Sequence, residues 1–139
     1  MFYKYSYTNY TYIQVKMEAF FEKYIKKLKE NSHIGENQEC IIWHGPLTKD
    51  GKYGLISISN PVSGIWQKKK AHRLSFMIHI KNLDLNSDLD CSHLCHNSLC
   101  VNPDHISLEP HHINNNRIHC KNEMKCSGHG IYPACRLEL

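Results

Sequence analysis

The amino-acid sequence predicts an α+β fold: one small domain with a mixed antiparallel sheet, stabilised by two structural zinc sites. The chain has 139 residues, about the length of one domain. It contains 7 Cys and 11 His but only 4 Phe and 2 Trp, so metal ligands are plentiful where large apolar side chains are few. Helical spacing and strand alternation both occur along it. We therefore expect residues 1–139 to form a single domain in which metal binding contributes to folding.

The first part of this domain, residues 1–39, is expected to hold a tail and one helix. Tyrosines alternate at positions 3, 5 and 7 and again at 10 and 12, so residues 1–14 are interpreted as an edge strand or a disordered tail. From Lys16 to Glu30 the apolar residues recur at helical spacing, which predicts an amphipathic helix. The lysines on its flank are interpreted as a solvated face, with phosphate contact as the alternative.

The second part, residues 40–90, is expected to contain the sheet. Lys52–Ser59 alternates apolar and polar residues after a turn signal, and Gly64–Lys70 follows a second turn signal. These segments are predicted to form a hairpin or two neighbouring strands. The apolar spacing of Ala71–Ile80 predicts a short helix packed on the sheet, and residues 82–90 are expected to be a turn-rich connection.

Charge and hydropathy limit the classes of function. No apolar run is long enough to span a membrane and no signal segment follows Met1, so we expect an intracellular protein without a membrane partner. Residues 1–70 carry eleven lysines against six acidic residues, whereas residues 71–139 carry six basic residues against seven acidic ones. The basic surface therefore belongs to the N-terminal half, which is compatible with nucleic-acid binding without demanding it.

Cysteine and histidine alternate densely in the third part, residues 91–139. Cys95, Cys100 and His105 have C-x4-C-x4-H spacing, which brings three zinc ligands together with little cost in chain closure. A structural zinc ion needs a fourth ligand, and Cys40 is the remaining cysteine outside this half of the chain. We therefore predict that Cys40 completes the first zinc site and ties the sheet to the C-terminal region.

A second set of ligands follows at C-x5-C-x2-H-x5-C spacing, and its members are Cys120, Cys126, His129 and Cys135. The histidine in each set favours zinc over an iron–sulfur cluster. Ordinary buried thiols are the alternative interpretation, but an odd number of cysteines interleaved with histidines in a non-secreted chain favours metal binding. Cys91 is left over and is expected to be a free structural thiol.

These residues carry a resemblance to a known family. The segment SHLCHN at 92–97, then Cys100, NPDH at 102–105, Asn114 and the second ligand set resemble the His-Cys box homing endonucleases, a branch of the HNH or ββα-metal nuclease superfamily. The likeness is specific from 91 to 135. It implies that residues 91–139 contain the ββα-metal nuclease motif and that residues 40–90 form a DNA-binding sheet.

The resemblance also implies roles for individual residues. His93 falls on the general base that activates water for attack on a DNA phosphodiester, and Asn114 falls on the ligand of a single catalytic Mg²⁺. Both residue types suit these tasks, because a neutral imidazole accepts a proton near neutral pH and an amide oxygen is a hard ligand. A basic residue of the sheet is expected against the scissile phosphate, and we choose Arg73, with the run 68–70 as the alternative. Spacing alone would allow three neighbouring histidines as base or ligand: His96, His111 and His112.

The implied partner is double-stranded DNA, read by one face of the sheet in the major groove. The candidate contacts are Lys52, Ser57, Ser59, Gln67, Lys68, Lys69 and Lys70. A one-residue change of register would exchange the two faces. The predicted function is an Mg²⁺-dependent DNA endonuclease of homing type, acting as a homodimer in the nucleus. Two alternatives stay open: a non-catalytic, zinc-stabilised DNA-binding module on the same scaffold, and a purely structural zinc protein.

Overall fold

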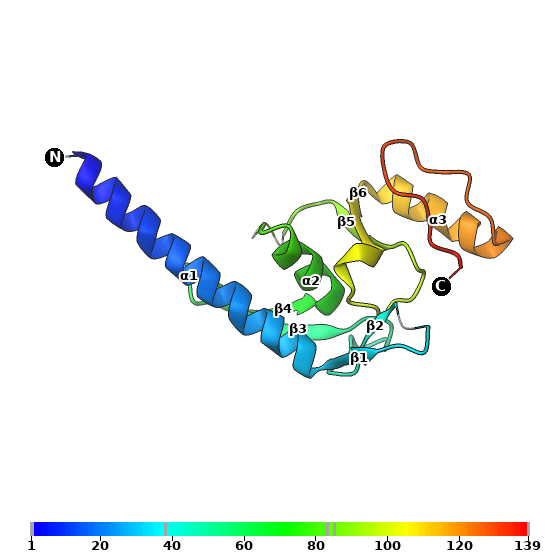
Figure 1. Cartoon of the computed structure of the whole chain (residues 1–139), viewed down its shortest axis with the longest axis horizontal. Coiled ribbons are helices and arrows are strands. Elements are labelled where there is room, and N and C mark those ends of the chain that lie inside the picture. The colour runs from blue at the N-terminus through cyan, green and yellow to red at the C-terminus, as the bar shows by residue number, and fades with distance from the viewer. Residues whose placement is uncertain (1, 38, 83, 85, 139) are drawn as a thin grey trace.

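The structure is a computed structural model that describes the backbone of residues 2–37, 39–82, 84 and 86–138, and the side chains of these residues from 11 onward. The described residues form three two-stranded antiparallel sheets and three α-helices, so the predicted mixed α+β class is confirmed (Figure 1). The sheets pair β1 (Ser32–Ile34) with β2 (Ile41–Trp43), β3 (Leu55–Ser59) with β4 (Trp66–Lys70), and β5 (Asp90–His93) with β6 (Ile106–Glu109). The helices are α1 (Phe2–Glu30), α2 (Ala71–His79) and α3 (His111–Glu123), and a short 3₁₀-helix, η1, covers Pro103–His105.

Helix α1 is longer than the sequence predicts. It begins at Phe2, so the interpretation of residues 1–14 as an edge strand or a disordered tail is wrong. Once a helix is nucleated, each added residue gains one hydrogen bond, and the strongly helical segment from Lys16 provides that nucleus. The tyrosine alternation is broken between positions 7 and 10, so it is a weak strand signal. Among the described residues, no helix combines the length and apolar composition needed to cross a bilayer.

The main core lies where the C-terminal half of α1 meets the β3–β4 ribbon and α2. Its buried members come from all of these elements and from the chain around Trp43: Phe20, Tyr24, Leu28, Trp43, Ile56, Ile58, Ala71, Leu74, Ile78 and Val101. The hydroxyl oxygen of Tyr24 accepts a hydrogen bond of 2.7 Å from the backbone N–H of Ser59. A Cβ atom at Gly54 would lie 2.5 Å from the Trp43 ring, so this position requires glycine. The core thus holds the ribbon and α2 in fixed positions.

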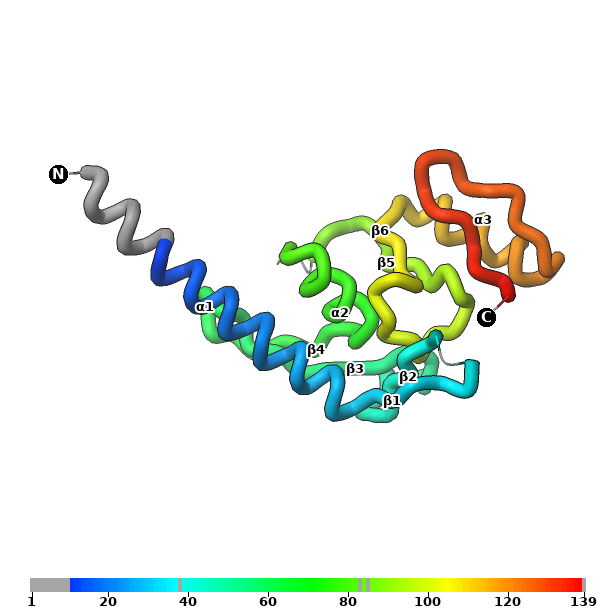
Figure 2. Tube along the Cα trace, viewed as in Figure 1, coloured from blue at the N-terminus to red at the C-terminus, as the bar shows by residue number. Residues whose placement is uncertain are grey.

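The second structural unit is a strand–strand–helix arrangement formed by β5, β6 and α3. In the β5–β6 pair Asp90 lies opposite Glu109 and His93 lies opposite Ile106. Pro110 precedes α3, and α3 ends at Glu123 because the next residue, Met124, has a φ of 53° that stops the helix. Figure 2 shows the chain after α3 turning back alongside this helix. The described C-terminal segment therefore packs on α3 rather than extending away from it.

Candidate functional site

The first predicted ligand set is assembled from three separate parts of the chain. Cys40 lies just before β2, Cys95 and Cys100 lie in the loop after β5, and His105 ends η1. Their four ligand atoms lie within 4.8 Å of one another, and all four residues are buried. Strand β2 positions Cys40, because the backbone N–H of Val101 donates to Ile41 at 2.7 Å. The structure therefore brings the distant cysteine to the loop as the sequence predicts.

The distances in this cluster fit a tetrahedral zinc site. The Nδ1 atom of His105 lies 3.6 Å from the Sγ of Cys40 and 3.5 Å from the Sγ of Cys100. Zinc–sulfur and zinc–nitrogen bonds of about 2.3 and 2.0 Å at a tetrahedral angle separate sulfur from nitrogen by about 3.5 Å. A hydrogen bond from Cys95, joined by backbone N–H groups such as that of Asn102, lowers the pKa of the Cys100 thiol to about 5. The same hydrogen bond, together with burial, raises the pKa of Cys95, so Cys100 is the thiol of this pair that more readily takes the thiolate form that binds zinc.

The second ligand set joins the end of α3 to the C-terminal segment. Cys120, Cys126, His129 and Cys135 place one ligand atom each within 4.8 Å of one another. The Nε2 atom of His129 lies 3.5 Å from the sulfurs of Cys120 and Cys135. Gly128 and Gly130 have φ values of 99° and 65°, which the turn around His129 requires. All four ligands are half-buried, unlike those of the first set.

Both clusters contain three cysteines and one histidine, which is a donor set typical of structural zinc. The arrangement is consistent with two structural zinc ions, and it uses six of the seven cysteines. The seventh, Cys91, is buried in β5, and burial raises the pKa of its thiol to about 11. Its protonated form agrees with the expected role as a free structural thiol.

His93 ends β5 next to the first cluster. Its Nε2 atom lies 2.9 Å from the carbonyl oxygen of Cys100, and a carbonyl only accepts, so Nε2 carries the proton and Nδ1 is left as the acceptor. Burial lowers the pKa of His93 to about 4. The imidazole is therefore neutral near neutral pH, with one nitrogen able to accept a proton from water.

Two aromatic residues that sequence reasoning assigned no role pack beside His93. The ring of His72 lies 4.2 Å from that of His93, centroid to centroid, and the Tyr53 ring lies 5.4 Å from His72 and 6.4 Å from His93. His72 is buried in the first turn of α2, and its Nε2 donates to the carbonyl oxygen of Cys91 at 3.1 Å. No local sequence signal identifies His72 or Tyr53: the packing of α2 against β5 brings His72 to His93, and Tyr53 comes from the separate segment before β3.

Asn114 lies in the first turn of α3 and lines a cavity of about 480 Å³ that Lys70 and His72 also line. Its side-chain nitrogen donates to Asp90 at 3.0 Å, and the Nδ1 of His111 lies 2.7 Å from the same carboxylate oxygen. Burial alone would raise the pKa of Asp90, but the hydrogen bonds from Asn114 and His111 hold it below its usual value. Asp90, like His72 and Tyr53, is a residue that sequence reasoning did not select.

Arg73 lines the same cavity but is tied to the loop before β5. Its guanidinium donates to the carbonyl oxygens of Ser87 and Leu89 at 2.8 and 2.7 Å. Lys70, one of the alternatives to Arg73, places its ammonium group 4.3 Å above the Tyr53 ring. The basic side of the cavity therefore comes from the end of β4 and the start of α2.

The ribbon divides the candidate DNA contacts between its two faces. Ser57 pairs with Lys68 and both are exposed, whereas Ile56 pairs with Lys69 and Ile56 belongs to the core. By the same alternation Ser59 and Lys70 share the exposed face, and Gln67 shares the inner face with Lys69. Lys52 precedes β3, because this strand begins at Leu55 rather than at 52. The predicted contacts therefore do not form one continuous face.

The fold and the site together define a zinc-binding ββα domain: two antiparallel strands and a helix joined to two Cys3His clusters. The model of a protein family described as the zinc-binding loop region of homing endonucleases matches residues 48–138. This match covers most of the chain and every cluster ligand except Cys40, and the chain belongs to that family. Comparisons with curated proteins and with solved structures gave no match.

Proposed function

We propose that the protein is an Mg²⁺-dependent DNA endonuclease of homing type that hydrolyses phosphodiester bonds in double-stranded DNA. The observation that carries the proposal is the hydrogen bond of 2.9 Å between His93 Nε2 and the Cys100 carbonyl. It fixes one neutral tautomer of the imidazole and leaves Nδ1 to accept a proton from the attacking water. The backbone of Cys100 belongs to the first cluster, so zinc binding would hold the general base in place.

Asn114 is the proposed protein ligand of the magnesium ion. The residues fit this ion, because an amide oxygen is a hard ligand and the adjoining cavity of about 480 Å³ has room for water and phosphate oxygens. A bound Mg²⁺ would supply the positive charge that stabilises the developing negative charge on the phosphate and the leaving 3′ oxygen. Lys70 and Arg73 line the same cavity, and we propose that one of them contacts the scissile phosphate.

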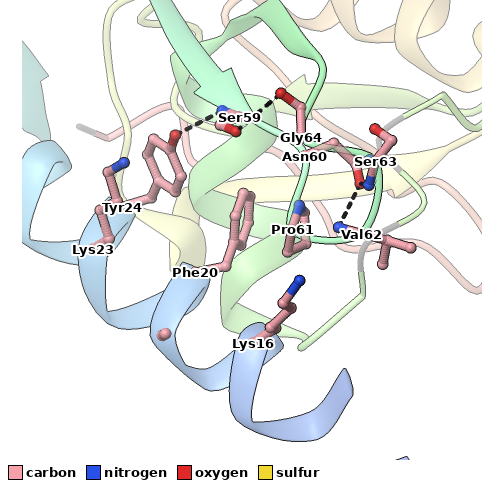
Figure 3. A pocket seen from close by; sticks show the side chains of 11 residues that line it. Lys16, Phe20, Lys23, Tyr24, Ser59, Asn60, Pro61, Val62, Ser63 and Gly64 are labelled. Carbon is pink, nitrogen blue, oxygen red and sulfur yellow. Dashed lines mark hydrogen bonds between the residues drawn. The ribbon is translucent and has the colours of Figure 1, made fainter. Parts of the chain in front are cut away.

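The exposed face of the β3–β4 ribbon is the proposed DNA-binding surface. Ser57, Lys68 and Lys70 lie on it, and a two-stranded ribbon fits the major groove. A groove of about 520 Å³ lies between α1 and the β3–β4 turn (Figure 3). Lys16 and Lys23 line the groove, so the flank of α1 is available to the phosphate backbone. A homodimer would place one catalytic site on each strand of the DNA duplex, and sedimentation analysis tests whether the protein forms that dimer.

Nicking of supercoiled plasmid DNA in the presence of Mg²⁺ tests the proposed function. His93→Ala and Asn114→Ala should abolish nicking while two zinc ions per chain and the circular dichroism spectrum are retained. His112→Ala and Asn115→Ala are matched controls, because both side chains are exposed on α3 near the site. Cleavage that persists in both site variants would overturn the assignment. Salt-dependent binding by the wild type without any cleavage would instead support the non-catalytic DNA-binding module.

A further inference from the structure

Two side chains of α3, the helix that carries the proposed metal ligand Asn114, contact the carboxylate of Asp90. Its Oδ2 atom lies 3.0 Å from the Nδ2 atom of Asn114 and 2.7 Å from the Nδ1 atom of His111. Asp90 begins β5 opposite Glu109, the last residue of β6, and α3 starts two residues later. The strand register therefore places this carboxylate beneath the first turn of α3.

The chemistry of a carboxylate determines which end of the Asn114 amide faces it. An ionised carboxylate only accepts hydrogen bonds, so the NH₂ group of the amide turns toward Asp90 and the amide oxygen turns away from it. Without this acceptor, rotation about the last side-chain torsion of asparagine is broad and nearly two-fold. Half of the accessible orientations would then present an NH₂ group, which cannot bind a cation.

We propose that Asp90 is a positioning residue that holds the Asn114 amide with its oxygen available to the divalent cation, while His111 holds the same carboxylate oxygen in place. The inference rests on the proposed function, because it concerns the same cation. Asp90 also lines the cavity next to Asn114, as do Lys70 and Arg73. Residues that orient a metal ligand in this way typically change metal affinity by about 10- to 100-fold when they are removed.

Two measurements on the zinc-loaded, full-length protein test the role of Asp90. Mn²⁺ alone serves as the probe for the magnesium site, and electron paramagnetic resonance of free Mn²⁺ gives its dissociation constant. The side-chain NH₂ signals of Asn114 in a nitrogen-15 NMR spectrum report the hydrogen bond itself. Asp90→Ala should weaken Mn²⁺ binding about 10-fold or more and shift the Asn114 NH₂ signals, with zinc content unchanged.

Conservative and matched variants separate positioning from simple charge. Asp90→Asn keeps an oxygen that can accept from Asn114, so it should bind Mn²⁺ more tightly than Asp90→Ala. Asp88→Ala removes a neighbouring exposed carboxylate and should leave Mn²⁺ binding unchanged. If Asp90→Asn is as weak as Asp90→Ala, or if Asp90→Ala binds Mn²⁺ like the wild type, positioning by Asp90 is wrong.

Asn114→Ala distinguishes a failure of this inference from a failure of the proposed function. Loss of Mn²⁺ binding in Asn114→Ala, together with unchanged binding in Asp90→Ala, would overturn the positioning role and leave the proposed metal ligand in place. Unchanged binding in Asn114→Ala would overturn the proposed metal ligand itself, and the role of Asp90 with it.

Discussion

The guanidinium of Arg117 donates two hydrogen bonds of 2.7 Å to the carboxylate of Glu109, and both side chains are fully buried. The same guanidinium donates to the carbonyl oxygen of Pro133 at 2.8 Å and to the sulfur of Cys135 at 3.4 Å. Arg117 is the one buried residue of α3, because the two isoleucines of this helix, Ile113 and Ile118, are half-buried and exposed. This pair therefore joins α3 to β6 and to the second cluster in place of an apolar interface.

Breaking this pair should be strongly destabilising. Glu109→Gln or Arg117→Met leaves one buried group without its partner, which costs about 3–5 kcal/mol of unfolding free energy. The double variant Glu109→Leu/Arg117→Met should recover part of that loss, because no charge is left buried alone. Urea unfolding in excess zinc measures these differences.

The exposed pair of Arg136 and Glu39, 2.9 Å apart, is the matched control for the buried pair. Glu39→Gln should cost less than about 1 kcal/mol, because solvent screens this interaction. Equal costs for Glu39→Gln and Glu109→Gln would contradict the structural importance assigned to the buried pair.

Local patterns predicted the elements whose signals are contiguous in the chain. Helix α2 ends one residue before the predicted Ile80, and the predicted segments 52–59 and 64–70 contain β3 and β4. The grouping of Cys40 with three distant ligands was also predictable, because the requirement for four zinc ligands limits the choices. The fixed number of zinc ligands thus predicts a long-range contact for which the sequence contains no local signal.

Features that depend on tertiary packing were not predicted. The Arg117–Glu109 pair, the His72–His93 contact and the Asn114–Asp90 hydrogen bond each join elements whose relative position no sequence period reveals. Gln67 and Lys69 lie on the opposite face of the ribbon from Ser57 and Ser59. This arrangement depends on the register between β3 and β4, which the alternation within one strand does not determine.

Removal of zinc should proceed in two steps. The second cluster is half-buried, and residues 125–138 contain no helix and only one isolated bridge, between His129 and Tyr132, so a chelator should take this ion first. The buried first cluster should release its ion later, with loss of most of the remaining structure, because structural zinc contributes folding free energy directly. A colorimetric zinc assay followed together with circular dichroism distinguishes the steps.

Serine variants assign the two steps of zinc release to their clusters. Cys126→Ser should retain one zinc ion and most of the helical signal, whereas Cys100→Ser should lose the fold around β2 and β5. An unchanged circular dichroism spectrum after both ions are removed would contradict a structural role for the clusters.

The salt dependence of DNA binding should identify the face of the ribbon that contacts phosphate. Lys68 is exposed beside Ser57, and replacing one phosphate-contacting lysine reduces the slope of log K against log salt by about 0.9. Lys68→Ala should show this reduction in a fluorescence-anisotropy titration of duplex DNA without divalent cations. Lys81→Ala is the control, because Lys81 lies beyond the other end of α2 and lines a different cavity. Equal slopes for Lys68→Ala and the wild type would show that Lys68 does not contact a DNA phosphate and would contradict DNA binding by this face of the ribbon at that position.

His72 should make the stability of the fold depend on pH below the ordinary pKa of histidine. Burial, followed by the positive charge on His93 when it is protonated and by Lys70 and Arg73, lowers the pKa of His72 well below 6.5. As the pH falls through 6.5, His72 therefore binds a proton in the unfolded chain but stays neutral in the folded chain. The contribution of His72 to the unfolding free energy is complete above pH 6.5 and is lost as the pH falls toward the pKa of His72 in the folded chain. The unfolding free energy should decrease by no more than about 1.4 kcal/mol per pH unit from this residue.

Replacing His72 by phenylalanine isolates this contribution. Phenylalanine keeps a ring against His93 but binds no proton, so His72→Phe should make the decline of unfolding free energy below pH 6.5 less steep and leave the part that His93 contributes through its own lowered pKa. His112→Phe, an exposed site on α3, should keep the wild-type decline. Zinc content measured at each pH separates this effect from metal release, because protonation of the ligands also releases zinc. A decline equally steep in His72→Phe, with both zinc ions bound, would show that His72 takes up its proton as readily in the folded chain as in the unfolded one.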